Sequence, residues 1–238
     1  MTAARLTRDQ VLAWRLRRQY LEAPAHSAID VVRRLCGVQA QVASAAEMAV
    51  GARLAPQRSG AVAHAMEDRA VIKTWAMRGT LHLLLADVAG AYLALIGSLK
   101  TWERPSWQKA FIPAAQVETL AEIAGEALDG RTLSREDLVA EVQARTQDAR
   151  LAEHLRSGWA AVLKPLAWRG LLCQGPGEGN RVTFTSPRTW SPAWGGLPET
   201  GEAARIRDSR LPGCLWTGLD GRLRRLADPR SLQQAVAA

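Results

Sequence analysis

Apolar residues in the N-terminal part of the chain recur every three to four positions, which is the spacing of helices with one buried face. Thr7 with Gln10 three residues later has the spacing of a capping box, so a helix is expected to begin directly after Thr7. Ser27 can cap a second helix, and Gly37 is suited to end it. Helices are therefore expected over residues 8–21, 27–35, 44–54 and 59–67.

The third of these helices follows the pentapeptide GVQAQ, residues 37–41. Ser44 and Glu47 have capping-box spacing, so the helix is expected to begin at Ser44. The pentapeptide then lies at the junction between two helices, where its side chains can face a cleft.

Further along the chain the hydrophobic pattern changes from helical to β-compatible. Residues 71–77 and 80–85 flank Arg78-Gly79, which indicates a hairpin with a glycine-containing turn. Helices followed by a β-hairpin are typical of a winged helix, a helix-turn-helix with a wing.

The same order of elements recurs in the second half. Helices are expected over residues 114–128, 134–144 and 155–168, the last kinked or broken at Pro165. The runs LLCQ and RVTFTS then flank the turn GPGEGN, which predicts a second hairpin. The sequence thus predicts a mainly α fold with small β-hairpins (α+β), built from tandem winged-helix domains. The units are residues 1–100, which carry GVQAQ, and residues 110–195, joined through TWERPSWQ.

The last segment, residues 200–238, does not follow this pattern. Its arginines are scattered without periodicity, and its strand signal is weak. A short helical appendage and a poorly ordered end are both compatible with it. We interpret it as an atypical tail, consistent with a truncated or frameshifted third domain.

The charge balance of the chain indicates the class of partner that it is expected to bind. The chain of 238 residues has a net charge of +8 and a sequence pI near 10.2, which favours a polyanionic partner, nucleic acid first. The alternative is that the arginines reflect a GC-rich genome, but Asp and Glu have not risen in step.

The remaining composition points to a soluble protein in a reducing compartment. Cys36, Cys173 and Cys214 lie far apart, without zinc-ligand spacing and without an indicated disulfide framework. No signal peptide is evident, and no apolar run approaches the roughly 20 residues that span a bilayer. We expect a cytoplasmic, nucleoid-associated monomer with no metal and no cofactor.

Four stretches carry a resemblance to a known family: LTRDQVLAWRLRRQYL, GVQAQVASAAEMAVGARL, TWAMRGTLHLLLADV and LAWRGLLCQGPGEGNRVTF. Together they resemble the AlkZ/YcaQ-type DNA glycosylases of the winged-helix DNA-binding superfamily, over roughly residues 5–200. That family has a catalytic Q-x-Q or Q-x-D motif, and Gln39 and Gln41 match the first form. The resemblance implies removal of alkylated purines, including bulky adducts and interstrand crosslinks, from double-stranded DNA.

Two glutamines make chemical sense as catalysts only for an activated substrate. A purine alkylated at N7 is already cationic, so it leaves without a general acid. The protein then has to place a water against C1′, which an amide oxygen can do while an amide NH₂ holds phosphate or sugar. The alternative is that Gln39 and Gln41 cap backbone groups at a helix junction.

Candidate DNA contacts surround both units. Arg78 lies in the first hairpin turn, and Thr80 and His82 alternate onto one face of the strand that follows. The remaining candidates are Arg33, Arg34, Arg131, Arg135, Arg169 and Arg181. His82 has the alternative role of a structural histidine.

The leading interpretation is a monofunctional DNA N-glycosylase, a hydrolase that excises N7-alkylated cationic purines by water attack at C1′. A non-catalytic winged-helix DNA-binding protein, either a transcription regulator or a truncated lesion binder, is the main alternative. A regulator has no evident need for the pair of glutamines.

Overall fold

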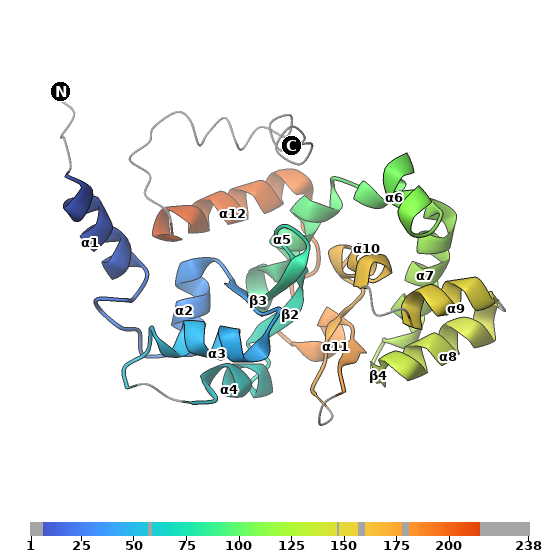
Figure 1. The fold of residues 1–238 in the computed structure, drawn as a ribbon, viewed down its shortest axis with the longest axis horizontal. Helices are drawn as coiled ribbons and strands as arrows, with labels where there is room; N and C mark the ends of the chain where they lie inside the picture. The colour runs from blue at the N-terminus through green and yellow to red at the C-terminus, as the bar shows by residue number, and fades with distance from the viewer. Residues whose placement is uncertain (1–6, 57–58, 147, 157–159, 178–180, 215–238) are drawn as a thin grey trace.

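A six-stranded antiparallel sheet forms the centre of the computed structural model, which describes residues 7–56, 59–146, 148–156, 160–177 and 181–214 (Figure 1). The strand order is β1-β3-β2-β5-β6-β4. The strands are β1 (Val38–Gln39), β2 (Val71–Ala76), β3 (Thr80–Leu85), β4 (Thr132–Ser134), β5 (Cys173–Gln174) and β6 (Thr183–Thr185).

Helices surround this sheet at both ends. In the first half they are α1 (Arg8–Arg18), α2 (Ala28–Leu35), α3 (Ala43–Gly51), α4 (Ala61–Glu67) and α5 (Ala86–Gly97). Beyond them lie η1 (Thr101–Glu103), α6 (Pro105–Ala110), α7 (Ala114–Ala127), α8 (Arg135–Thr146), α9 (Ala149–Arg156), η2 (Ala160–Val162), α10 (Lys164–Trp168), α11 (Pro187–Trp190) and α12 (Thr200–Cys214). Among the described helices, none is long and apolar enough to cross a membrane.

The first hydrophobic cluster holds α2, α3 and α4 against the β1–β3 end of the sheet. Val31 of α2, Val50 of α3 and Leu83 of β3 are at most 1% exposed and belong to it. Burial of such side chains contributes about 1.5–3 kcal/mol each, so this cluster fixes the position of β1 relative to the helices.

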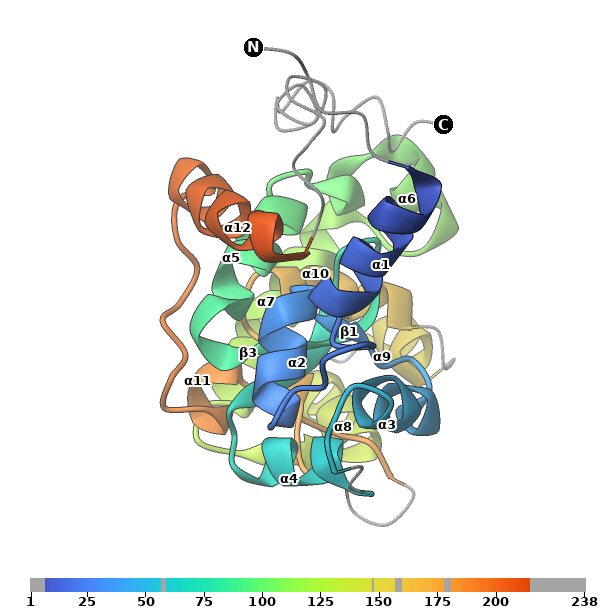
Figure 2. The ribbon, with the colours of Figure 1, turned by 90° about the vertical axis from the view of Figure 1, so that its left-hand side faces the viewer.

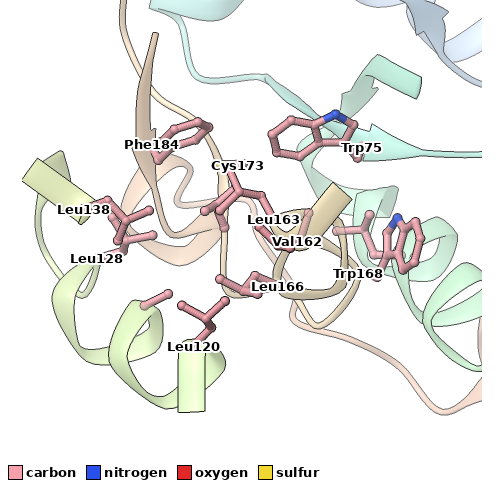
Figure 3. Packing of buried hydrophobic residues seen from close by; sticks show 14 of the residues in the cluster. Trp75, Leu120, Leu128, Leu138, Val162, Leu163, Leu166, Trp168, Cys173 and Phe184 are labelled. Carbon is pink, nitrogen blue, oxygen red and sulfur yellow. The ribbon is translucent and has the colours of Figure 1, made fainter. Parts of the chain in front are cut away.

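The second cluster is larger and is shared by the two halves of the chain. Trp75 of β2 stacks on Phe184 of β6 with ring centroids 6.3 Å apart, and both lie near Leu163 and Leu166 in Figure 3. Lys73 of β2 pairs with Gln174 of β5, which joins the two hairpins into one sheet.

Two further hydrogen bonds tie the second half to the start of β2. The indole N–H of Trp190 donates to the Val71 carbonyl at 2.8 Å, and the Ser191 hydroxyl donates to the Arg69 carbonyl at 2.7 Å. The chain then runs to α12, which lies along α5 and α2 (Figure 2).

Most predicted elements are present with shifted ends. The capping box at Thr7/Gln10, the helix start at Ser134, both hairpins and α7 lie where the sequence predicted them. The single helix expected at residues 155–168 was wrong: residues 155–156 end α9, residues 160–162 form η2, and Pro165 lies in the first turn of the separate helix α10, while residues 157–159 lie outside the described part. The helical form of residues 200–214 agrees with one of the two alternatives for the tail, and residues 215–238 lie outside the described part.

Two expectations need correction, and one needs an addition. Glu47 does not cap α3, because its carboxylate accepts from the backbone N–H groups of Val62 and Ala63 at the start of α4. The expected position of GVQAQ between two helices is confirmed, because it lies between α2 and α3, and its Val38–Gln39 additionally forms strand β1. Cys36 is disulfide-bonded, whereas the cysteine spacing had given no indication of a disulfide.

Candidate active site

Strand β1 is positioned by a tight exit from α2. Cys36 ends the helix in the left-handed region at φ 58°, and Gly37 follows at φ 125°. A Cβ on Gly37 would lie 2.7 Å from Leu84 Cδ2 and 3.3 Å from the Leu83 carbonyl oxygen. Only glycine allows the backbone to adopt this conformation so close to β3, and the approach places the two glutamines on the edge of the sheet.

Gln41 completes the pairing of β1 with β3 by means of its side chain. The Ala40 N–H donates to the Leu81 carbonyl at 2.8 Å, as in an antiparallel ladder. The Leu81 N–H, however, donates to Gln41 Oε1 at 3.2 Å. Because a backbone N–H can only donate, the amide oxygen of Gln41 must face β3, and its NH₂ group is directed away from that bond. The residue itself is exposed.

Gln39 lies in a row of polar residues that crosses three strands. It is the Cα partner of His82 on β3, which in turn pairs with Thr74 on β2. Paired residues of neighbouring strands share one face of the sheet. The row therefore runs from an exposed amide, through a half-buried imidazole, to a hydroxyl that is 0% exposed.

The hydrogen-bonding states along this row differ. The Thr74 hydroxyl donates to the Leu172 carbonyl at 3.4 Å. His82 Nδ1 lies 2.9 Å from the Thr80 carbonyl oxygen, so Nδ1 carries a proton and Nε2 is the acceptor of the neutral ring. Within the described residues, the Gln39 side chain has no hydrogen bond, so its amide is available to a ligand.

The turn between β2 and β3 adds positive charge to this end of the sheet. Arg78 is exposed at the turn, and Thr80 is half-buried at the start of β3. A Cβ on Gly79 would lie 3.6 Å from Lys164 Nζ of α10, so the ammonium group approaches the turn. Burial lowers the pKa of Lys164. The hydrophobic pattern of the sequence does not place Lys164 beside this turn; only the fold does.

The two arginines of α2 lie just before β1 in the chain. Arg33 forms a 3.1 Å ion pair with Asp30 in the same helix. Arg34 stacks over the Tyr20 ring, with its guanidinium carbon 5.0 Å from the ring centroid. Both side chains therefore have protein partners that a phosphate contact would have to supplement or replace.

The candidate arginines of the second half are dispersed. Arg131 pairs with Glu141 at 2.9 Å, and Arg169 pairs with Glu118 at 2.7 Å. Arg135 is half-buried at the start of α8, and Arg181 is exposed just before β6. The structure thus brings Gln39, Gln41, Thr80 and His82 together, whereas these four arginines belong to other elements.

Sequence reasoning missed Thr74 and the backbone N–H of Leu81 as parts of this region. Strand alternation could have identified Thr74, but only the β1–β3 pairing reveals the role of Leu81. No group of three or more His, Cys, Asp or Glu residues in the described segments could hold a metal ion.

The site thus consists of two exposed amides, Gln39 on the edge strand β1 and Gln41 two residues further on, at one end of a six-stranded sheet surrounded by helices. Comparison with known families identifies the class of protein. The family model described as "DNA glycosylase AlkZ-like" matches residues 32–212, and the chain belongs to this family.

The curated relative and the solved structure that resemble this chain both come from Streptomyces sahachiroi. A curated relative named "Interstrand DNA cross-link repair glycosylase" is 50% identical over 198 residues, covering 82% of this chain and 53% of the relative. The solved structure of Streptomyces sahachiroi DNA glycosylase AlkZ superposes with a TM-score of 0.83 at 46% identity, covering 89% of this chain and 58% of that chain. The chain spans about half the length of the curated relative.

Proposed function

We propose that this protein is a monofunctional DNA glycosylase that removes cationic N7-alkylated purines from duplex DNA, including bulky adducts and interstrand crosslinks. Family membership and the relative's name support the glycosylase class. The observation that carries the mechanism is the unequal state of the two amides: Gln41 Oε1 is occupied by the Leu81 N–H, and the Gln39 amide has no partner in the described part of the chain.

This difference supports separate roles for the two glutamines in the proposed mechanism. The Gln39 carbonyl oxygen accepts from a water and places it against C1′ of the lesion nucleotide. The Gln41 NH₂ donates to a phosphate or sugar oxygen, because its carbonyl oxygen is already bound to β3. Both groups are neutral, so they stabilise a cationic, oxocarbenium-like sugar without supplying an acid.

The reaction suits an alkylated purine for reasons of charge. The purine leaves as a neutral base when it takes the electron pair of the C1′–N9 bond, so protonation of the leaving group is unnecessary. Uracil and 8-oxoguanine lack this activation and are expected to remain in the DNA.

The architecture supports duplex binding by a monomer. We interpret residues 1–100 and 110–195 as tandem winged-helix units whose wings are the β2–β3 and β5–β6 hairpins. Arg78, Thr80 and Lys164 at the first wing, with the arginines of α2, provide the phosphate contacts nearest to the glutamines.

The proposal is tested with a duplex that contains a single N7-methylguanine, incubated with excess protein and then treated with alkali. Strand cleavage at the lesion reports an abasic site, and a uracil duplex of the same sequence is the control. Tight binding without any base release would favour the lesion-binding or regulator alternative.

A further inference from the structure

His82 occupies the position next to Gln39 on the face of the sheet that carries the row of polar residues. The two residues are Cα partners across β1 and β3. At the adjacent pair, the Ala40 N–H donates to the Leu81 carbonyl at 2.8 Å. Backbone-bonded and non-bonded positions alternate along an antiparallel pair, and side chains at non-bonded positions approach each other more closely. The Gln39 amide and the His82 ring are therefore near neighbours, about 4.5–5.5 Å apart at Cβ in such pairs.

The imidazole is oriented by the strand that carries it. Its Nδ1 is 2.9 Å from the Thr80 carbonyl oxygen two residues earlier, so this nitrogen bears the proton and Nε2 has the free lone pair. On the far side, the Thr74 hydroxyl is fully buried and donates to Leu172, so Nε2 is not needed as its acceptor. Among the described residues no hydrogen bond involves Nε2, just as none involves the Gln39 amide.

We infer that His82 is a catalytic residue, the general base that takes the proton of the water held by Gln39. This inference rests on the glycosylase activity proposed above. The water bonds through one hydrogen to Gln39 Oε1 and through the other to His82 Nε2. As its oxygen attacks C1′, the C1′–N9 bond breaks and its electron pair neutralises the N7-alkylpurine. The proton passes to His82 Nε2, and the resulting imidazolium returns it to solvent.

This assignment solves the weakness of an all-amide site. Amides accept hydrogen bonds but cannot hold a proton near neutral pH, whereas an imidazole has its ordinary pKa in that range. With the proton on Nδ1, Nε2 of the neutral ring can accept a hydrogen bond from water but cannot donate one to a phosphate oxygen.

Three substitutions separate the base from a structural histidine. His82→Ala removes both ring nitrogens. His82→Asn retains an N–H that can reach the Thr80 carbonyl but has no group at the Nε2 position. His82→Gln places an amide near Nε2 that can bind water without taking its proton. All three are expected to lose at least about tenfold in single-turnover excision of N7-methylguanine, within the range of general-base contributions, with duplex affinity retained. Wild-type-like excision by His82→Asn, with wild-type thermal stability, would overturn the inference.

The pH profile of excision provides the readout that a structural role would not change. In the wild type, the excision rate, corrected for spontaneous depurination, should rise about tenfold per pH unit at acidic pH and then become constant. This rise with pH should be absent in His82→Gln. The charged or titratable groups on elements packed against β3 are Asp30, Arg33 and Arg34 of α2, Lys73 of β2, and Asp87 and Tyr92 of α5. Lys73 pairs with Leu83 and so faces the opposite side of the sheet from His82. Burial lowers the pKa of Lys73 and raises that of Tyr92. The comparison with His82→Gln isolates the contribution of His82 from those of these groups and of the other histidines.

The outcomes distinguish the two levels of the proposal. A wild-type chain that releases no base from any N7-alkylated duplex refutes both the glycosylase activity and the role of His82. An active wild type that is impaired by Gln39→Ala but not by the His82 variants refutes the base alone.

Discussion

The side chain of Gln41 takes the place of a backbone acceptor for Leu81, whose N–H donates to Gln41 Oε1 at 3.2 Å. One amide thus continues the pairing of β1 with β3 and presents its NH₂ group at the edge of the sheet. Gln41 can therefore both satisfy a backbone group and act in catalysis. Gln39 makes no hydrogen bond to the described residues, so only the catalytic interpretation applies to it. This difference allows the two roles to be measured separately.

Gln41→Glu should separate support of the strand from catalysis. A carboxylate still accepts from the Leu81 N–H, so the melting temperature should be close to that of the wild type. It has no NH₂ donor and brings negative charge toward phosphate, so excision of N7-methylguanine should fall at least about tenfold, or 1.4 kcal/mol in transition-state stabilisation. Gln41→Ala is the matched variant: it should lose activity and also about 1 kcal/mol of folding free energy. Full activity of the Glu variant would limit Gln41 to a structural role.

Gln39→Ala should lower single-turnover excision by at least about tenfold without a measurable change in unfolding free energy. The side chain is exposed and makes no hydrogen bond to the described residues, so truncation removes no internal contact. Denaturant unfolding and excision kinetics on the same preparation check this. An equal loss of stability and activity would instead identify Gln39 as a cap.

Duplex binding should be strongly salt-dependent and nearly independent of sequence, because a chain of charge +8 binds mainly to phosphates. Each phosphate contact contributes a slope of about −0.9 in log K against log salt, so Arg78→Gln should reduce the slope by roughly one unit. Arg156→Gln is the matched control, since this exposed arginine already bonds to Glu153 and Gln143. Titrations that give the same duplex affinity at about 50 mM and about 200 mM salt would contradict a binding mode dominated by phosphate contacts.

Gly90→Ala should destabilise the protein severely. A Cβ at this position in α5 would lie 1.9 Å from the backbone oxygen of Gly196, so either the helix or the segment leading to α12 must move. The cost should exceed about 3 kcal/mol, at the upper end of ordinary substitutions.

Gly125→Ala is the control for Gly90. It lies inside α7, where the nearest atom to an added Cβ is Leu171 Cδ2 at an ordinary 3.8 Å. Relief of the glycine penalty in a helix should stabilise the protein by about 0.5–1 kcal/mol. Thermal melts that shift in the same direction for both variants would contradict the packing of Gly90 against Gly196.

The sequence predicted the parts of the fold that depend on local signals. Thr7 with Gln10 and Ser134 with Asp137 form capping boxes because the interaction spans only three residues. Glu47 has the same spacing from Ser44 yet caps another helix, since α4 folds back beside α3 and offers its own N-terminal N–H groups. Local spacing cannot reveal a competing donor fifteen residues away.

The candidate site was predicted by residue type and resemblance but not by geometry. The glutamines were identified as a pair, and the strand alternation of Thr80 and His82 is present in β3. The two-residue strand β1 carries too short a pattern to be recognised in the sequence. The pairing of Gln39 with His82 depends on a register between segments about forty residues apart, which no local rule supplies.

The pairing of Lys73 with Gln174, together with the bonds from Trp190 and Ser191 to the start of β2, has a mechanical consequence. Since the two halves share one hydrogen-bonded sheet, a change in the angle between them would break backbone bonds and separate Trp75 from Phe184. In the proposed complex with duplex DNA, the double helix and not the sheet would therefore have to bend, at a cost of about 1–6 kcal/mol for a bend of 40–90°. Lesions that soften base stacking lower that cost, so DNA flexibility itself would contribute to the choice of site.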